Sequence, residues 1–399
     1  MMNFVFISPN FPHTYWQFCY RLRNNGVNVL GVGDCPYDAL EPALKGSLTE
    51  YYKVDSLENY DQVYRAVAFF AFKYGRIEWL ESNNEYWLEQ DANLRKDFNI
   101  QTGVQPEELA LWKHKSAMKP VYRAAGIPTA RNHKVTDIEA ARAFLKEIGG
   151  YPVIVKPDVG VGASDTWKLE NDADLERFYA NRPAVPYVME EFVFGNIYSY
   201  DAICDSNGDP LFESSNWFPP SIADLVNKDL ELAYYVTAEV PPALRDLGRK
   251  ALKGFQVRRR FVHFEFFCLT QARPNLGEVG DFVGLEVNMR PAGGYTPDMM
   301  DYAHSTDVYQ IYADMVTSDK RLLPDSGNHQ YCVYAARKDS HHYAHTHEEI
   351  LARYGNRIVM CERMPEVLSA AMGSQMYTAK VPAMEDVQEF IEFVQKRAE

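Results

Sequence analysis

The chain has 399 residues, which is too many for one compact core, so two or three domains are expected. Hydrophobic residues make up 46% of the chain and charged residues 24%, which excludes a largely disordered or fibrous protein. Acidic residues outnumber basic ones by 55 to 41, giving a formal net charge of −14. This negative charge argues against nucleic acid and anionic membrane surfaces as partners.

The sequence indicates a cytoplasmic location. Its first residues lack the basic and long apolar segments of a secretory leader, and no stretch approaches the roughly 18 consecutive apolar residues of a membrane span. The six cysteines are scattered and form no CxxC pair. We therefore expect reduced thiols rather than a disulfide framework or a cysteine zinc site.

The first part of the chain alternates apolar runs with helical patterns. Strands are predicted at residues 4–7, 27–32 and 77–81, and helices over 15–22 and 60–74. Such alternation predicts a Rossmann-like parallel sheet. Gly31-Val32-Gly33 lacks the third glycine and the helix start of a dinucleotide fingerprint, so a structural turn is favoured there.

A second unit is predicted to begin near Leu109. A helix follows Lys115, another covers residues 137–148, and an apolar strand covers 153–156. From there to about residue 290 the pattern is mostly extended, with helices predicted over 224–232 and 242–254.

The last part, from about His329, again alternates strands and helices. A strand is predicted at residues 331–335, and a terminal helix over 387–396. Thr346 and Glu349 have the spacing of a capping box, which predicts a helix start.

Two lysines stand where a phosphate partner would explain them. Lys115 precedes a predicted helix, and Lys156 ends the apolar strand over 153–156. A buried ammonium group must be paired, and phosphate is a common partner for it. An ordinary surface lysine explains Lys115 equally well, whereas Lys156 has little water available within Val-Ile-Val-Lys-Pro.

A loop of small residues follows this strand and consists of Gly160, Val161, Gly162, Ala163 and Ser164. The backbone N–H groups of such a loop can approach phosphate oxygens closely. The Walker A pattern is absent, and taken alone the loop is better explained as an ordinary hairpin turn.

The most specific pattern is a set of acids in predicted strands. Glu265 lies within an apolar strand, and Glu286, Asn288 and Arg290 alternate along another. Alternating residues share one face of a strand. Oxygen ligands that converge from neighbouring strands suit Mg²⁺ held together with substrate phosphates. The alternative is a buried salt bridge from Arg290 to Glu286 or Glu265, which leaves a carboxylate and an amide unexplained.

The order of these motifs resembles the ATP-grasp superfamily, in the branch of carboxylate-amine ligases and carbamoyl-phosphate-synthase-like proteins. The resemblance implies an α/β and α+β architecture, with a Rossmann-like parallel-sheet domain before a two-subdomain ATP-grasp fold. It divides the chain into a Rossmann-like pre-ATP-grasp domain (1–109), a small subdomain that forms the nucleotide lid (110–190), a large subdomain with the metal site (191–328), and a C-terminal α/β extension packed on the large subdomain (329–399).

The resemblance also implies a role for each nucleotide-binding residue. Lys115 and Lys156 would contact the α- and β-phosphates, while residues 160–164 would close over the nucleotide. A hinge that holds adenine would be formed by Glu190, Glu191, Phe192 and Val193. In many family members an acid near Ile197 binds the ribose; Ile197 cannot do this, so no ribose ligand is assigned.

The metal and substrate roles follow from the same resemblance. Glu265 and Glu286 would hold two Mg²⁺ ions, which Mn²⁺ could replace, and Asn288 would complete one of them. Arg290, with Asn288 and Lys156, would act on the reacting carboxylate and the γ-phosphate. Gly293 and Gly294 could present backbone N–H groups to the substrate carboxylate.

Glu85 is a further candidate for contact with the substrate. It follows an apolar strand of the opening domain, and loops at the carboxyl ends of parallel strands line the ligand crevice. Core packing of Trp87 and capping by Asn84 are equally good explanations of this segment.

The predicted function is an ATP-dependent ligase that phosphorylates a small-molecule carboxylate and joins the acyl group to an amine. A bicarbonate-activating enzyme of the carboxylase or carbamoyl-phosphate type and a non-catalytic ATP-binding regulatory protein are the alternatives. The 26 tyrosines and 22 phenylalanines leave room for a homo-oligomer interface.

Two other charged runs have structural interpretations. The histidine cluster over residues 341–347 is better explained by a turn before the helix at Thr346 than by a metal site. The basic run from Arg258 to Arg260 is better explained by an exposed strand start, or by cover for an acidic neighbour, than by phosphate binding.

Overall fold

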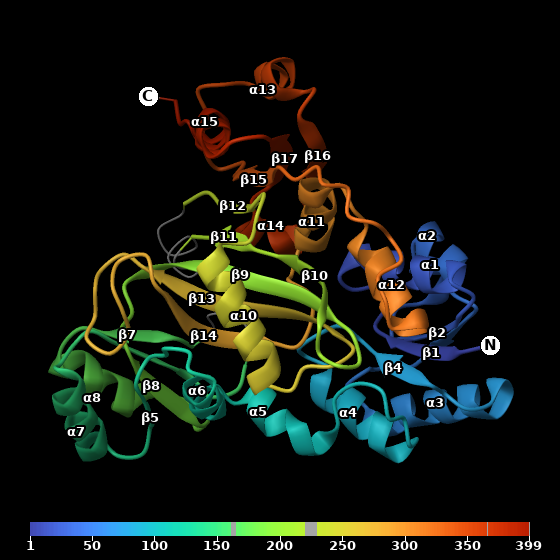
Figure 1. The fold of residues 1–399 in the computed structure, drawn as a ribbon, viewed down its shortest axis with the longest axis horizontal. Coiled ribbons are helices and arrows are strands. Elements are labelled where there is room, and N and C mark those ends of the chain that lie inside the picture. The colour runs from blue at the N-terminus through green and yellow to red at the C-terminus, as the bar shows by residue number, and fades with distance from the viewer. Residues whose placement is uncertain (161–164, 220–229, 365, 399) are drawn as a thin grey trace.

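The computed structural model describes residues 1–160, 165–219, 230–364 and 366–398. Three sheets organise these residues: a four-stranded parallel sheet, a four-stranded antiparallel sheet and a nine-stranded antiparallel sheet (Figure 1). This mixed architecture confirms the predicted fold class. The loop residues Val161, Gly162, Ala163 and Ser164 and most of the helix predicted over 224–232 lie outside the described residues.

The parallel sheet is built by the first part of the chain. Its order is β3-β2-β1-β4, formed by Glu50–Lys53, Asn28–Gly33, Asn3–Ile7 and Trp79–Glu81. The helices of this part are α1 (Trp16–Asn24), α2 (Pro42–Ser47), α3 (Tyr60–Tyr74) and α4 (Leu88–Asp97), with short 3-10 turns at His13–Tyr15, Tyr37–Ala39 and Pro106–Glu108. The strands and the helices over 15–22 and 60–74 confirm the sequence prediction.

The smaller antiparallel sheet has the order β5-β8-β6-β7. Its strands are Asn132–Lys134, Tyr187–Glu191, Val153–Pro157 and Trp167–Leu169. Helices α5 (Leu109–Lys113) and α6 (Lys115–Ala124) precede it, and α7 (Ile138–Ile148) and α8 (Asp172–Asn181) pack on it. Asp137 caps α7 by accepting from the Ala140 N–H, as expected for a short polar residue at a helix start.

The nine-stranded sheet is the centre of the molecule (Figure 1). Its main path is β14-β13-β9-β11-β12-β15-β17-β16, and β10 pairs with β9. The strands before residue 300 are β9 (Gly195–Cys204), β10 (Pro210–Ser214), β11 (Asn216–Phe218), β12 (Ala233–Val236), β13 (Arg260–Leu269) and β14 (Phe282–Asn288). The helices here are α10 (Pro242–Gly254), α11 (Thr296–His304) and α12 (Val308–Ser318).

The C-terminal part continues the same sheet. Strand β12 pairs with β15 (Tyr331–Arg337), which pairs with β17 (Gln375–Val381), and β16 (Ile358–Arg363) forms the edge. The helices are α13 (His347–Tyr354), α14 (Glu366–Met372) and α15 (Met384–Gln395). The predicted capping box is present, because Thr346 and Glu349 each accept from the other's backbone N–H. His341 Nδ1 lies 2.8 Å from Glu231, and His347 Nδ1 lies 2.9 Å from the Tyr377 hydroxyl.

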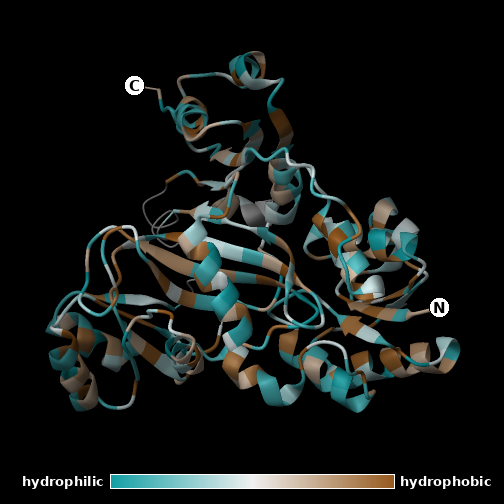
Figure 2. Cartoon of the chain, in the orientation of Figure 1, coloured by the Kyte–Doolittle hydropathy of each residue, from teal (hydrophilic) through white to brown (hydrophobic). Residues whose placement is uncertain are grey.

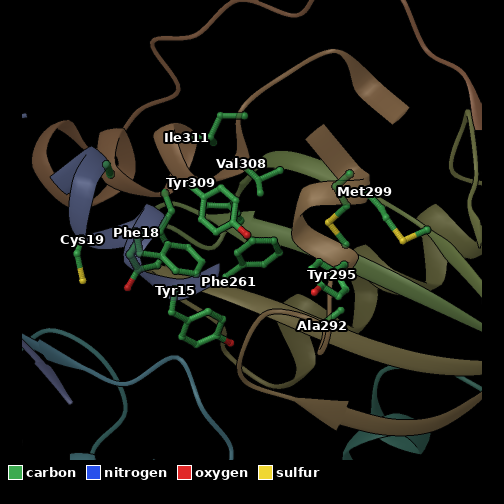
Figure 3. Close-up of a cluster of buried hydrophobic side chains, with 14 of the residues drawn as sticks. Tyr15, Phe18, Cys19, Phe261, Ala292, Tyr295, Met299, Val308, Tyr309 and Ile311 are labelled. Carbon is green, nitrogen blue, oxygen red and sulfur yellow. The ribbon is translucent and has the colours of Figure 1, made fainter. Parts of the chain in front are cut away.

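A shared apolar core joins the parallel-sheet domain to the large sheet (Figure 3). The Phe18 ring of α1 lies 4.7 Å from the Tyr309 ring and 5.0 Å from the Tyr312 ring of α12. Phe261 of β13 belongs to the same cluster. The helices carry apolar and hydrophilic residues side by side, as amphipathic helices over a core do (Figure 2). Within the described ranges, no helix is both long and apolar enough to cross a bilayer.

Candidate active site

Strands β13 and β14 bring the predicted acids together. Glu265 lies directly opposite Glu286 in the antiparallel register, and His263 lies opposite Asn288. Directly opposed residues share a face of the sheet, with Cβ atoms about 5 Å apart. The two carboxylate side chains are partly exposed, at 28% and 20%. The register therefore places two partly exposed carboxylates together, with the buried Asn288 amide close by.

Arg290 lies beyond the strand predicted for it. Strand β14 ends at Asn288, so Arg290 follows the strand and donates from Nη1 to the Pro291 carbonyl at 2.7 Å. Over the ranges that the structure describes, no carboxylate lies within ion-pair distance of this guanidinium. The alternative salt bridge from Arg290 to Glu286 or Glu265 is therefore wrong, and Arg290 is available for an anionic ligand.

Lys115 joins the acids from the other side of the site. It is the first residue of α6, and its Nζ lies 3.2 Å from Glu286 Oε1 and donates to the Gly160 carbonyl at 2.9 Å. Asp158 fixes this helix start by accepting from the backbone N–H groups of Lys115 and Ser116. The buried lysine is thus held between a candidate metal ligand and the first residue of the small-residue loop.

Two further lysines lie on either side of Glu190. Lys156 Nζ lies 3.0 Å from Glu190 Oε2, and Lys119 Nζ lies 3.3 Å from Glu190 Oε1. All three side chains are buried. Burial acts to raise the pKa of Glu190, but the two ammonium groups outweigh it and hold that pKa below its usual range. Burial acts to lower the pKa of Lys156, and Glu190 and Glu286 raise it above its usual value. Two buried ammonium groups therefore share the Glu190 carboxylate.

The predicted hinge residues differ in their contacts: Glu190 and Glu191 end β8, and Phe192 and Val193 follow it. Glu191 points away from Glu190 and is bound by Arg131, whose Nη2 lies 2.7 Å from Oε2. Phe192 accepts at its backbone carbonyl from Arg273 Nη2 at 3.0 Å, and Val193 is buried. The backbone of this segment therefore connects the small sheet to β9.

A buried histidine–aspartate pair lies beside Glu265. His263 Nε2 lies 3.3 Å from Glu265 Oε1, and His263 Nδ1 lies 2.8 Å from Asp201 Oδ1. Burial acts to lower the pKa of His263, but the two carboxylates raise it to about 9. Burial likewise acts to raise the pKa of Glu265, and His263 holds it below the usual range.

Glu85 faces the same site from the parallel-sheet domain. Its Oε2 atom is buried and has no hydrogen-bond partner in the part of the chain that the structure describes. Burial raises the pKa of this carboxyl; Arg290 opposes that shift, and Glu286 adds to it. Glu85 is therefore within electrostatic reach of Arg290 and Glu286. Gly293 and Gly294 follow Arg290 and lead into α11, and the Gly294 backbone has a φ of 62°.

The donor set fits Mg²⁺ bound together with phosphate. Glu265, Glu286 and Asn288 offer hard oxygen atoms, and Mg²⁺ usually takes one or two carboxylates and completes its shell with phosphate oxygens and water. No group of three or more His, Cys, Asp or Glu forms a self-sufficient metal cage among the described residues. The nearby ammonium groups of Lys115 and Lys156 suit the phosphates of the same ligand.

Three residues of this site were not predicted from the sequence. Lys119 lies one helical turn after Lys115, and this i,i+4 spacing on a helix could have revealed a second buried lysine. His263 stands two residues before Glu265 and so shares its strand face. Asp201, the partner of His263, lies on a strand that is distant in the sequence, and no local pattern predicts that pairing.

No family model matches the chain. The chain is 25% identical over 293 residues to alanine–anticapsin ligase of Bacillus subtilis strain 168, covering 66% of this chain and 59% of the relative. The chain thus spans about three fifths of the length of that curated relative.

Solved structures match almost the whole chain. L-amino acid ligase from Bacillus licheniformis superposes with a TM-score of 0.70 at 14% identity, over 98% of this chain and 96% of that one. The chain has the ATP-grasp fold. Another ATP-grasp neighbour is the biotin carboxylase domain of 2-oxoglutarate carboxylase from Hydrogenobacter thermophilus, in complex with MgADP, ADP and bicarbonate. Its TM-score is 0.70 at 15% identity, over 98% of this chain and 88% of that one.

Proposed function

We propose that the chain is an ATP-dependent ligase that phosphorylates a carboxylate and transfers the acyl group to an amine. One observation carries this proposal: the lysines proposed to bind phosphate and the acids proposed to bind metal converge in one region of an ATP-grasp fold. Lys115 and Lys156 are buried cations beside the opposed pair Glu265 and Glu286. Among relatives and neighbours, the alanine–anticapsin and L-amino acid ligases support ligation as the reaction.

The chemistry requires charge neutralisation at the phosphates and at the reacting carboxylate. Glu265, Glu286 and Asn288 would bind two Mg²⁺ ions. These ions would offset negative charge on the phosphates. Lys115 and Lys156 would hold the phosphate chain in line, and the backbone of residues 190–193 would hold the adenine. The loop from Gly160 to Ser164 would cover the nucleotide.

Two bond exchanges complete the reaction. A carboxylate oxygen attacks the γ-phosphorus and ADP leaves, which converts the carboxylate to an acyl phosphate. The amine nitrogen then attacks the acyl carbon, phosphate leaves, and the nitrogen loses a proton to form the amide. Arg290, free of carboxylate partners in the described residues, would stabilise the anionic acyl phosphate and the tetrahedral intermediate.

Amino acids are the proposed substrates. Arg290 offers a cation to a substrate carboxylate, and Gly293 and Gly294 can add backbone N–H groups. Glu85 offers a buried carboxyl oxygen with no other partner in the described chain, and a substrate ammonium group would satisfy it. A binding site with opposite charges at its two ends suits a zwitterion.

The setting of the reaction belongs to the same proposal. All six cysteines are free thiols, which supports a cytoplasmic location. The net charge of −14 supports small-molecule substrates rather than nucleic acid. A homo-oligomer stays an expectation from the aromatic composition.

The test is ADP release from ATP and Mg²⁺ with amino acids supplied singly and in pairs. We expect release that needs two amino acids and falls by about 100-fold or more in Glu286→Gln, because that change removes a charged metal ligand. Glu392→Gln, on the exposed face of α15, is the matched control and should keep full activity.

Other outcomes would change the assignment. Release that bicarbonate alone stimulates would favour the bicarbonate-activating alternative, which the likeness to a biotin carboxylase also supports. ATP binding without release from any amino acid or carboxylate pool would favour a regulatory nucleotide-binding protein. Normal turnover by Glu286→Gln would show that Glu286 is not a metal ligand.

A further inference from the structure

The central sheet carries a polar row of which the reaction described above uses only Glu265. On β9 and β13, Asp201 lies opposite His263, and Ser199 lies opposite Glu265. These residues alternate with apolar neighbours along their strands, so their side chains share one face of the sheet. Asp201 and Ser199 are fully buried, while Glu265 is partly exposed. A line of polar groups therefore runs from the interior to the candidate metal site.

Asp201 is held in one orientation by contacts on both of its oxygens. Oδ1 lies 2.8 Å from His263 Nδ1. Oδ2 accepts from the Ser199 hydroxyl and, at 2.8 Å, from the Asn216 amide of β11. Asn216 also donates to Ser199 Oγ at 2.8 Å, which closes the network. Because both oxygens are engaged by buried groups, Asp201 is a rigid anchor.

His263 transmits that orientation to Glu265. Both ring nitrogens lie beside carboxylates: Nδ1 is hydrogen-bonded to Asp201 at 2.8 Å, and Nε2 lies within ion-pair distance of Glu265, at 3.3 Å. The Phe218 ring lies edge-on to the imidazole at 5.9 Å and limits its rotation. His263 lies against Glu265 Oε1, and over the described ranges no ion pair involves Oε2, which leaves that atom for a metal ion. Ligands held by an outer layer of hydrogen bonds bind metals more tightly than mobile ones.

We propose that Asp201 and His263 are positioning residues that fix Glu265 for metal binding. This inference rests on the proposed function, because it takes Glu265 as a Mg²⁺ ligand. In this role His263 acts through Glu265 and not directly on the nucleotide or the reacting atoms. It acts by selecting one rotamer of Glu265, opposite Glu286 in the register. Its loss lowers the affinity for the metal, and a higher concentration of Mg²⁺ compensates for that loss.

Two substitutions at residue 263 separate positioning from folding. The amide nitrogen of an asparagine lies close to the place of Nδ1, and that of a glutamine lies close to the place of Nε2. His263→Asn therefore keeps the buried bond to Asp201 and loses the contact with Glu265, whereas His263→Gln does the reverse. If the histidine is needed only for folding, His263→Asn is the milder change. If it positions Glu265, His263→Asn is the more severe change for metal binding.

The experiment is an electron paramagnetic resonance titration of Mn²⁺ into the full chain with a non-hydrolysable ATP analogue. We expect His263→Asn to raise the Mn²⁺ dissociation constant by about 10- to 100-fold, His263→Gln to raise it less, and Asp201→Asn to raise it measurably. The half-saturating Mg²⁺ concentration for ADP release should rise in parallel, with activity recovered at high Mg²⁺. His304→Gln is the matched control, since this buried histidine bonds Ser214 Oγ at 2.9 Å on another part of the sheet.

The outcomes distinguish the two levels of the proposal. The positioning role is overturned if Glu265→Gln binds Mn²⁺ weakly while folded His263→Asn and Asp201→Asn bind it as the unmodified chain does. That result leaves the ligase proposal intact. Unchanged binding in Glu265→Gln would overturn both the metal assignment and the positioning role. If His263→Asn does not fold, Asp201→Asn decides, and unchanged Mn²⁺ binding in folded Asp201→Asn overturns the positioning role. Absence of nucleotide-dependent Mn²⁺ binding in the unmodified chain would contradict the proposed function itself.

Discussion

Two buried clusters have the same charges and different chemistry. The phosphate cluster comprises Lys119, Lys156 and Glu190, and the junction cluster comprises Glu81, Arg95 and Arg260. Each places two cations on one carboxylate. The first lies at the candidate nucleotide site, and the second lies where the parallel-sheet domain meets the large sheet.

The difference lies in the head groups and in their other partners. In the junction cluster, Glu81 Oε2 accepts from Arg95 at 2.8 Å and from Arg260 at 2.6 Å. The guanidinium groups also donate to the backbone carbonyls of Leu80, Val104 and Met289. Arginine has a planar fork of donors that can satisfy several fixed acceptors, whereas lysine is a compact point charge suited to phosphate. The comparison suggests that the arginine cluster fixes the domain junction and the lysine cluster binds a ligand.

Breaking the junction cluster is expected to have the largest effect on stability. Glu81→Gln leaves two buried guanidinium groups without their carboxylate and should lower the free energy of unfolding by about 3–5 kcal/mol. Urea-induced unfolding measures this change. Glu107→Gln, which removes an exposed partner of Lys96, is the control and should leave the urea midpoint unchanged. Equal urea midpoints for the two variants would show that the junction cluster does not stabilise the fold.

Breaking the phosphate cluster should instead reduce activity. Lys156→Met is expected to lower ADP release by about 100-fold, because a preorganised cation at the phosphates is lost. Its unfolding free energy should change less than that of Glu81→Gln, since Lys119 still pairs with Glu190. Urea-induced unfolding measures this change in stability. Thermal unfolding with and without ATP measures ligand binding, and ATP should raise the unfolding temperature of the variant less than that of the unmodified chain. Lys146→Met, on an exposed face of α7, is the control.

Two outcomes would contradict the contrast between the two clusters. If Lys156→Met is destabilised as strongly as Glu81→Gln and keeps its response to ATP, the lysine cluster is structural. If Lys146→Met loses activity to the same extent, general charge rather than position explains the loss.

A smaller effect concerns Asp91, which lies beside the junction cluster. Burial raises the pKa of Asp91 to about 7, and Glu81 adds to this shift. A carboxyl whose pKa is higher in the folded state favours folding while it is protonated. Its contribution is therefore present in acid and is lost as pH rises from about 4 towards about 7.

Asp91→Asn tests that pH dependence. The amide oxygen can still accept from the Ser82 backbone N–H and hydroxyl, which Asp91 Oδ2 binds at 3.0 and 2.6 Å. We expect the variant to lose less stability than the unmodified chain between pH 4 and pH 7. Urea midpoints across this range measure the difference. Parallel curves for the two proteins would show that Asp91 does not ionise differently in the folded state.

The sequence predicted much of the fold because its signals are local. The helix over 60–74 matches α3, and the capping box at Thr346 and Glu349 is formed. The extended pattern over Glu286 and Asn288 was also correct, but Arg290 lies outside the strand that ends before it. Periodicity reveals an element's existence more reliably than its end, which depends on the hydrogen bonds of neighbouring strands.

The site was predicted in part for the same reason. The pairing of Glu265 with Glu286 follows once β13 and β14 are aligned, and the sequence placed both acids in strands. The buried partners Lys119 of Glu190 and Asp201 of His263 depend on tertiary contacts between distant segments. Of the basic run, Arg260 covers the acidic Glu81, as one of the two structural interpretations expected.

The most direct test of the central claim follows an oxygen atom. The amino acid that supplies the acyl group is labelled with ¹⁸O in its carboxylate, and the released phosphate is analysed by mass spectrometry after ligation with ATP and the amine partner. An acyl phosphate route predicts one labelled oxygen in phosphate for each amide formed, because the carboxylate oxygen that attacked the γ-phosphorus leaves with it. Amide formation with unlabelled phosphate would contradict this account.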